Sequence, residues 1–404
     1  MKRILLLLLA LGAVCSLNAK TRKCLYRVTV TGKRAECPVV IRDVPEWAQS
    51  AVVSLGGVHR IPSQLDRELG ELVFVSGISG SQNFQVLYSS DPDKRVFKKR
   101  VHAQMWLKNP DKTLRAVGCA SSDKLHHHGP AFESEYAAYR IYFDNKQTID
   151  TYGKKRPQLE LAETMWYPSD EQLSRGYGHD NLRVFGSVGV GTLKGWDAEK
   201  RKMVHITDFK RREARILADG PIRTVVEMRV EGWRYGGREI TMTSRYILYA
   251  GHGDVQVENR IEGDFRGLVF TTGVMKMAES EVCKNDNVIA AFGRDFPEND
   301  TVKWERESVG LAVAVPQRQI VSQTDDKTSY LFQLTPDARG RIDYAFEMAQ
   351  GPQRYRMRPG TDGVGGCGPD PGRRFADQTV LRKSASFASK NPCPISGGSV
   401  LLYT

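Results

Sequence analysis

Residues 125–153 (LHHHGPAFESEYAAYRIYFDNKQTIDTYG) carry the densest set of side chains in the chain that can move protons or bind anions. Three consecutive histidines precede a Gly-Pro breaker, two glutamates follow it, and an arginine between two tyrosines comes next. Imidazole and carboxylate groups exchange protons with sugar oxygens, and a guanidinium stabilises the anion left by proton removal. The catalytic candidates here are His127, His128, Glu133, Arg140 and Tyr142, with Glu135 and Tyr136 as candidate substrate contacts.

A second polar segment follows at residues 166–180. It contains Trp166, Tyr177 and the pair His179–Asp180, in which a carboxylate could orient the imidazole. We predict that His179 joins the catalytic set and that Trp166, Tyr177 and Asp180 contact substrate. The opposing interpretation is a histidine triplet in an ordinary solvated loop, with sequence neighbours that point apart.

Three reactions fit these residue types: general acid–base catalysis on a sugar, proton abstraction from a uronic acid, and hydrolysis by a carboxylate pair. In the second, Arg140 would stabilise the dianion while a tyrosine or histidine transfers the proton. Hydrolysis ranks last, because Glu133 and Glu135 are too close along one strand to span a glycosidic bond. No cofactor is expected, and a divalent metal held by His126, His128 and a carboxylate is the alternative.

The aromatic run Tyr136–Phe143 predicts the strand that positions the first set. Alternate side chains of a strand share a face. One face would then present Tyr136, Ala138, Arg140 and Tyr142, and the other would place Ala137, Tyr139, Ile141 and Phe143 in the core. A helix over Phe132–Phe143, which the two alanines permit, is the alternative.

Period-two alternation broken by glycine turns dominates the rest of the chain and predicts an all-β fold. The clearest case is an antiparallel meander over 221–263, with turns at 235–237 and 251–254. The glycines of Leu182–Gly195 predict places where the backbone turns or where a ligand approaches closely. Weak helix patterns cover Ile342–Gln350 and Ala376–Lys390, and Gly398–Tyr403 predicts a closing strand. We expect residues 20–404 to form a single domain, with an alternative boundary at Lys108–Lys112.

The first 19 residues are typical of a secretory signal peptide, with Lys2 and Arg3 before an apolar run and Ala19 at the cleavage site. A lipoprotein anchored at Cys15 is the less favoured alternative. We therefore predict a periplasmic or secreted protein without a transmembrane segment. Export permits disulfides, and Cys24 with Cys37, which flank a candidate hairpin, is the favoured pair.

The chain of 404 residues has a formal net charge of +12, and loss of Lys2 and Arg3 with the leader leaves +10. Two runs concentrate this charge, Lys94–Arg100 and Lys210–Arg215. A basic exported protein suits an acidic oligosaccharide or polysaccharide as partner. A nucleic-acid partner is not expected, because no binding motif is present. The oligomeric state is left open.

Residues 127–154 and 176–191 (GYGHDNLRVFGSVGVG) together resemble a secreted domain-of-unknown-function family of Bacteroidetes that is found among glycan-degradation genes. The resemblance extends over nearly the whole mature chain. It implies a galactose-mutarotase-like supersandwich, that is, a large antiparallel β-sandwich, and a carbohydrate ligand. It does not imply a particular reaction or assign residues.

These observations predict an exported carbohydrate-active enzyme for uronate-containing or other acidic glycan fragments, working by lyase- or epimerase-type proton transfer. The alternative is a non-catalytic glycan-binding protein of the cell envelope. On the first hypothesis, His128→Ala and Arg140→Ala are expected to abolish turnover while leaving thermal melting largely intact.

Overall fold

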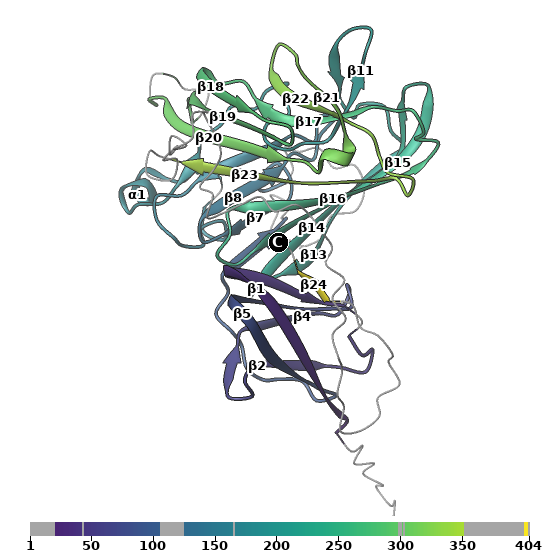
Figure 1. Ribbon diagram of the computed structural model, residues 1–404. Coiled ribbons are helices and arrows are strands. Elements are labelled where there is room, and N and C mark those ends of the chain that lie inside the picture. The colour runs from purple at the N-terminus through teal and green to yellow at the C-terminus, as the bar shows by residue number, and fades with distance from the viewer. Residues whose placement is uncertain are drawn as a thin grey trace, which may run out of the picture.

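The described residues fold mainly into antiparallel strands, as the sequence predicts (Figure 1). The computed structural model describes residues 21–42, 44–105, 125–164, 166–297, 301, 304–350 and 400–402. In this part of the chain the helical segments are α1 (Asp170–Ser174) and the 3₁₀ turn η2 (Gln317–Gln319). The all-β expectation is therefore confirmed.

The strands of the described residues form four sheets. The N-terminal sheet contains β1 (Lys23–Ile41), β2 (Ser50–Leu55), β3 (His59–Ile61), β4 (Ser63–Asp66), β5 (Glu71–Ser89) and β24 (Val400–Leu402). A sheet that we call the site sheet contains β6 (Val101–Gln104), β7 (Ala131–Ser134), β8 (Ala137–Ile141), β9 (Ile149–Gly153) and β10 (His179–Asp180).

The eight-stranded sheet contains β13 (Arg211–Asp219), β14 (Arg223–Tyr235), β15 (Arg238–Tyr249), β16 (Asp254–Gly263), β18 (Ala278–Lys284), β19 (Val288–Asp295), β20 (Glu307–Ala314) and β23 (Arg341–Gln350). The fourth sheet contains β11 (Lys194–Asp197), β12 (Lys202–Val204), β17 (Phe270–Met275), β21 (Ile320–Asp325) and β22 (Ser329–Leu334).

The main core lies between the eight-stranded sheet and the two five-stranded sheets that face it. Residues 189 and 190 link the two five-stranded sheets, because Gly189 pairs with Ile149 of β9 and Val190 pairs with Val274 of β17. The linked sheets form one layer of a sandwich, and the eight-stranded sheet forms the other. Gly189 has φ +57, and a Cβ there would lie 1.9 Å from the carbonyl oxygen of Ile149. A side chain at this position would therefore clash with the neighbouring strand β9.

The meander predicted over 221–263 corresponds to β14, β15 and β16, which pair in that order. The alternation predicted for β15 is also present, because Met242, Tyr246 and Leu248 enter the main core. The helix expected at Ile342–Gln350 is wrong. This segment is β23, and its alternate residues are buried from Ile342 onward.

The N-terminal sheet forms the lower body in Figure 1 and has its own apolar core. The predicted pairing of Cys24 with Cys37 is wrong, because both lie on β1, thirteen positions apart in sequence. At about 3.3 Å per residue they are separated by about 40 Å, far beyond the reach of a disulfide. The closing strand predicted at Gly398–Tyr403 is confirmed as β24, which pairs with β1.

Three expectations fall outside the described residues: the leader 1–19 with Cys15, the boundary at Lys108–Lys112, and the helix at Ala376–Lys390. The described part of the chain contains no helix long and apolar enough to cross a membrane.

A buried histidine holds the N-terminal sheet against the main body. His252 Nδ1 lies 2.9 Å from Asp254 Oδ1, and His252 Nε2 lies 2.7 Å from the carbonyl oxygen of Glu36 on β1. Burial alone would lower the pKa of His252, but the charge of Asp254 and these two hydrogen bonds raise it above its ordinary value, against a smaller opposing effect of Arg34. The imidazolium, which donates from both nitrogens, is the form that satisfies both acceptors.

We expect this contact to make stability depend on pH. A raised folded-state pKa contributes stability that is fully present below the unfolded value of about 6.5 and is lost as the pH rises through the folded-state pKa. The melting temperature should therefore fall across that window, and His252→Gln should flatten the fall. Scanning calorimetry of both proteins over this range checks the prediction, and parallel curves for the two proteins would contradict it.

Candidate active site

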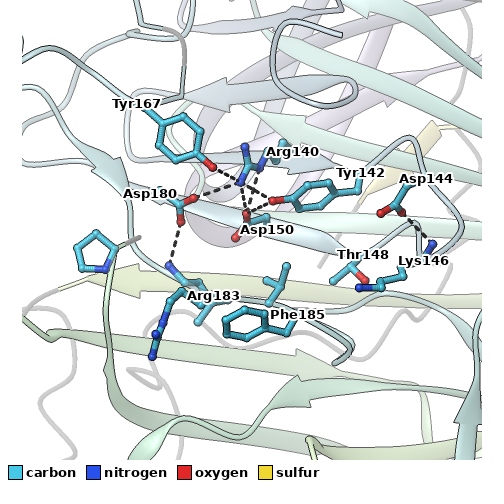
Figure 2. A pocket seen from close by; sticks show the side chains of 13 residues that line it. Arg140, Tyr142, Asp144, Lys146, Thr148, Asp150, Tyr167, Asp180, Arg183 and Phe185 are labelled. Carbon is cyan, nitrogen blue, oxygen red and sulfur yellow. Dashed lines mark hydrogen bonds and ion pairs between the residues drawn. The ribbon is translucent and has the colours of Figure 1, made fainter. Parts of the chain in front are cut away.

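A cavity of about 350 Å³ lies on the face of β8 that carries Arg140 (Figure 2). Its volume is at the lower end of those typical of small-molecule sites. The residues that line it come from β8 and β9, from the turn that joins them, and from segments 167–185 and 297. They are Arg140, Tyr142, Asp144, Lys146, Thr148, Asp150, Tyr167, Asp180, Leu182, Arg183, Val184, Phe185 and Pro297.

The strand alternation predicted for Tyr136–Phe143 explains why the cavity lies on this face. Tyr139 and Ile141 enter the main core from β8, together with Phe143 just beyond it. Arg140 and Tyr142 point to the opposite side, where the Nη2 atom of Arg140 donates to the Tyr142 hydroxyl at 2.6 Å. The predicted alternation of this strand, with Tyr139, Ile141 and Phe143 in the core and Arg140 and Tyr142 on the other face, is therefore confirmed.

Arg140 lies at the floor of the cavity and is 1% exposed. Its direct cross-strand neighbour on β9 is Asp150. The Oδ2 atom of Asp150 accepts from Nε at 3.0 Å and from Nη2 at 2.7 Å. Nη2 also donates to Asp180 Oδ2 at 3.1 Å and to the Tyr167 hydroxyl at 3.1 Å. One guanidinium thus holds two carboxylates and two phenols together (Figure 2).

Trp166 supports this cluster from behind. Its ring lies 4.6 Å below the guanidinium carbon of Arg140, and its Nε1 donates to Asp180 Oδ2 at 3.1 Å. A cation over an aromatic ring and a hydrogen bond to a carboxylate are both favourable in a buried setting. The other oxygen of Asp180 accepts from the main-chain N–H of Leu182 at 3.1 Å. Asp180 is thereby fixed in one orientation at the cavity floor.

The cluster changes the protonation of its members. Burial and the adjacent Asp150 raise the pKa of Asp180 well above its ordinary value, and Arg140 offsets only part of this effect. Burial likewise raises the pKa of Asp150, against the opposing charge of Arg140. Burial and the carboxylates raise the pKa of the Tyr142 hydroxyl, so this phenol stays protonated at neutral pH. Carboxylates shifted towards neutral pH in a cleft are typical of proton-transfer sites.

Strained backbone gathers around the cavity. Four non-glycine residues at or next to its wall have left-handed φ values: His128 (60), Gln147 (51), Trp166 (73) and Phe185 (38). Such a conformation is costly for bulky side chains and concentrates at functional sites. Phe185 is also 60% exposed and Tyr167 is 41% exposed, so two aromatic rings stand open to solvent at the cavity mouth.

The histidines of the two motifs lie around the cavity and do not line it. His127 is buried, stacks on His126, and contacts the ring of Trp166 edge-on with the ring centres 6.0 Å apart. Burial and the neighbouring His126 and Arg140 lower its pKa well below the ordinary value, so it is a neutral imidazole. His128 packs against the ring of Tyr142.

His179 precedes Asp180 but points the other way. Its Nδ1 lies 2.6 Å from the carbonyl oxygen of Asp180, and its Nε2 lies 3.1 Å from Glu307 Oε1. The expected orientation of this imidazole by the side chain of Asp180 is therefore wrong, because the alternation of β10 places the two side chains on opposite faces. Both remain close to the site, but only Asp180 lines the cavity.

The remaining candidates are engaged elsewhere. Glu133 is fully buried, is paired with Lys154, and accepts from the main-chain N–H of Glu160 and Leu161 at 2.9 Å. Glu135 accepts from Arg100 and from the N–H of Gly251. The Tyr177 hydroxyl binds Glu163, and Tyr136 follows the end of β7. None of these four residues lines the cavity among the residues that the structure describes.

The site residues absent from the sequence-based set are chiefly Asp150, Tyr167, Lys146 and Phe185. A signal for Asp150 was available, because it is a single carboxylate within an otherwise buried strand, directly opposite Arg140. The others lie in turns, where no periodicity predicts side-chain direction. Within the described residues no group of three or more His, Cys, Asp or Glu side chains is placed to hold a metal ion.

Comparisons with known proteins place the chain in a family. Two solved structures from Enterococcus faecalis are similar at 8% identity, and each alignment covers 82% of this chain. One is a protein in glycosyl hydrolase family 38 (TM-score 0.41, 45% of its length covered) and the other an alpha-mannosidase from strain V583 (TM-score 0.38, 44% covered). The chain thus spans less than half the length of either.

No curated protein matches the chain. A family model described as "Domain of unknown function (DUF4861)" matches residues 36–351, which include every strand of the site sheet and the whole lining of the cavity. The chain therefore belongs to the DUF4861 family.

Proposed function

We propose that this protein is an exported carbohydrate-active enzyme that acts on uronate-containing or other acidic glycan fragments by lyase- or epimerase-type proton transfer. The observation that supports this most directly is the cluster at the cavity floor, where Arg140 joins Asp180, Asp150 and two tyrosine hydroxyls. Exposed aromatic rings beside it offer stacking surfaces to a sugar ring.

Asp180 is the residue that we assign to proton transfer. It lines the cavity, and its raised pKa brings it closer to neutral pH, where a general base or acid is most effective. Asp150 is more deeply buried and acts as a positioning residue through Arg140. The hydroxyl of Tyr142 donates to Asp150 Oδ2 at 3.4 Å, and the hydroxyl of Tyr167 is placed to donate a hydrogen bond to an enolate-like anion next to the substrate carboxylate.

The proton balance of this step is simple. Removal of the proton on the carbon next to the carboxylate leaves a resonance-stabilised anion and a protonated Asp180. In an epimerase, Asp180 releases its proton to solvent, and a proton from solvent is added to the opposite face of that carbon. In a lyase, the anion expels the glycosidic oxygen, which takes up a proton, and a carbon–carbon double bond remains. Both routes therefore begin with the same bond cleavage, between carbon and hydrogen.

That shared step gives the test. Short oligogalacturonides and oligoglucuronides would be incubated with the protein in deuterated water, with proton NMR and ultraviolet absorbance recorded together. Deuterium at the carbon next to the carboxylate indicates an epimerase, and absorbance of an unsaturated uronate indicates a lyase. Binding without either signal would replace the proposal with the rival, a non-catalytic glycan-binding protein, which the aromatic rings also support.

The same proposal includes export to the periplasm or the medium. N-terminal sequencing of the protein from fractionated cells would test it, with cleavage after Ala19 as the expected result.

A further inference from the structure

The turn between β8 and β9 is held in place by several hydrogen bonds, from its own main chain and from buried side chains. It spans 144–148 and presents Asp144, Lys146 and Thr148 to the cavity (Figure 2). Asp144 Oδ1 accepts from the N–H of Lys146 at 2.8 Å and from the N–H of Gln147 at 2.9 Å. The side chain of Asp144 therefore closes the turn on itself, which is a common role for Asp in tight turns.

Two buried basic side chains, Lys194 and Arg212, donate hydrogen bonds to the same turn. Lys194 on β11 is fully buried, and its Nζ donates to the carbonyl oxygen of Lys146 and to Thr148 Oγ1, the latter at 3.1 Å. Arg212 on β13 is 2% exposed, and its Nη1 donates to the carbonyl oxygen of Asp144. Burial lowers the pKa of Lys194 to about 7, so burying this group costs free energy, and here both basic side chains donate to main-chain oxygens of one short turn. The arrangement fixes where Lys146 stands.

Lys146 also differs from the other cations of the cavity. Arg140 is paired with Asp150 and Asp180, and Arg183 is paired with Asp295 at 2.9 Å. Across the described ranges, no carboxylate lies within ion-pair distance of the Lys146 ammonium. Asp144, the nearest acidic residue in sequence, has one of its oxygens engaged by two N–H groups of the turn. Of the three cationic side chains that line the cavity in the described part of the chain, Lys146 is therefore the one that can form an ion pair with a ligand.

We infer that Lys146 binds the carboxylate of the substrate and gives this cavity its preference for acidic over neutral sugars. The inference rests on the proposed function and deepens it, because it names the residue that selects a uronate. Lys194 and Arg212 are positioning residues for this contact. An ammonium–carboxylate hydrogen bond at a partly enclosed site discriminates by about tenfold or more against a neutral ligand.

The test compares the binding of digalacturonate with that of its carboxyl-reduced, neutral counterpart by isothermal titration. In the wild type we expect the acidic ligand to bind more tightly. Lys146→Met should reduce the ratio of the two affinities by about tenfold, mainly by weakening the acidic ligand. Lys202→Met removes an exposed lysine of β12 outside the cavity and is the matched control, with an unchanged ratio expected.

The outcomes separate the inference from the proposed function. An unchanged ratio in Lys146→Met, with both ligands still bound, overturns the inference and leaves the proposed function standing. Failure of the wild type to bind either ligand overturns both. Lys194→Met gives a second measurement, because a displaced turn should lower the same ratio and also speed amide hydrogen exchange at residues 144–148. Unaltered exchange there would overturn the positioning role.

Discussion

Replacing Asp180 with Asn is expected to lower turnover by about 10²–10⁴-fold, the contribution typical of a general acid or base. Asn keeps the shape of the side chain, and its oxygen can still accept from Trp166 Nε1 and from Arg140, although the N–H of Leu182 loses its acceptor. It cannot accept or release the proton. The initial rate of deuterium incorporation or of unsaturated-uronate release measures the loss, and an unaltered rate would remove Asp180 from the mechanism.

The same variant should keep or raise the stability of the fold. The raised pKa of Asp180 means that folding disfavours its charge, because the side chain is buried beside Asp150. A neutral amide relieves this repulsion, so the melting temperature at neutral pH should not fall. Asp219→Asn is the matched control: it alters a carboxylate outside the cavity that pairs with His102, and turnover should persist.

The pH dependence of turnover gives an independent check on Asp180. Asp180 must be deprotonated to act as a base. Because its pKa is raised, the rate should increase at a higher pH than an ordinary Asp carboxyl group would give. The acidic limb of the profile should therefore lie above about pH 4, the ordinary value for Asp, and should disappear in Asp180→Asn. A limb that persists in the variant would assign it to another group.

Replacing Arg140 with Met is expected to destabilise the fold by about 3–5 kcal/mol, because it leaves Asp150 and Asp180 buried beside each other without their shared cation. This revises the expectation that Arg140→Ala leaves thermal melting largely intact. The side chain is 1% exposed and serves both carboxylates, so a loss of turnover in this variant would not by itself identify a catalytic role. Urea unfolding followed by circular dichroism measures the change.

Two further variants test the reason for this effect. Adding Asp150→Asn and Asp180→Asn to Arg140→Met removes the unpaired charges and should restore much of the lost stability. Arg183→Met is the control at the same cavity, since Arg183 is paired with Asp295 but its side chain is 25% exposed, and its loss should be smaller. If the two variants Arg140→Met and Arg183→Met lost the same free energy of unfolding, burial would not explain the effect.

How much of the site the sequence predicts depends on whether the residue lies in a strand. The alternation of Tyr136–Phe143 correctly places Arg140 and Tyr142 on one face and the core residues on the other, because the period of a strand is a local property. The same rule, applied to residues 342–350, would have given β23 in place of a helix. The alternation is present in that segment, but Ala345 and Ala349 also fit a helix and made the pattern ambiguous.

The sequence by itself determines the antiparallel β architecture, the meander and the site face of β8, since these follow from period-two patterns and glycine turns. Only the tertiary structure decides which polar groups meet. It brings Asp150 and Asp180 to one guanidinium, turns His179 away from Asp180, and keeps the histidine triplet out of the cavity wall. The physical reason is that strand pairing between distant segments and the packing of turns set these contacts, and neither is encoded by the spacing of residues along one segment.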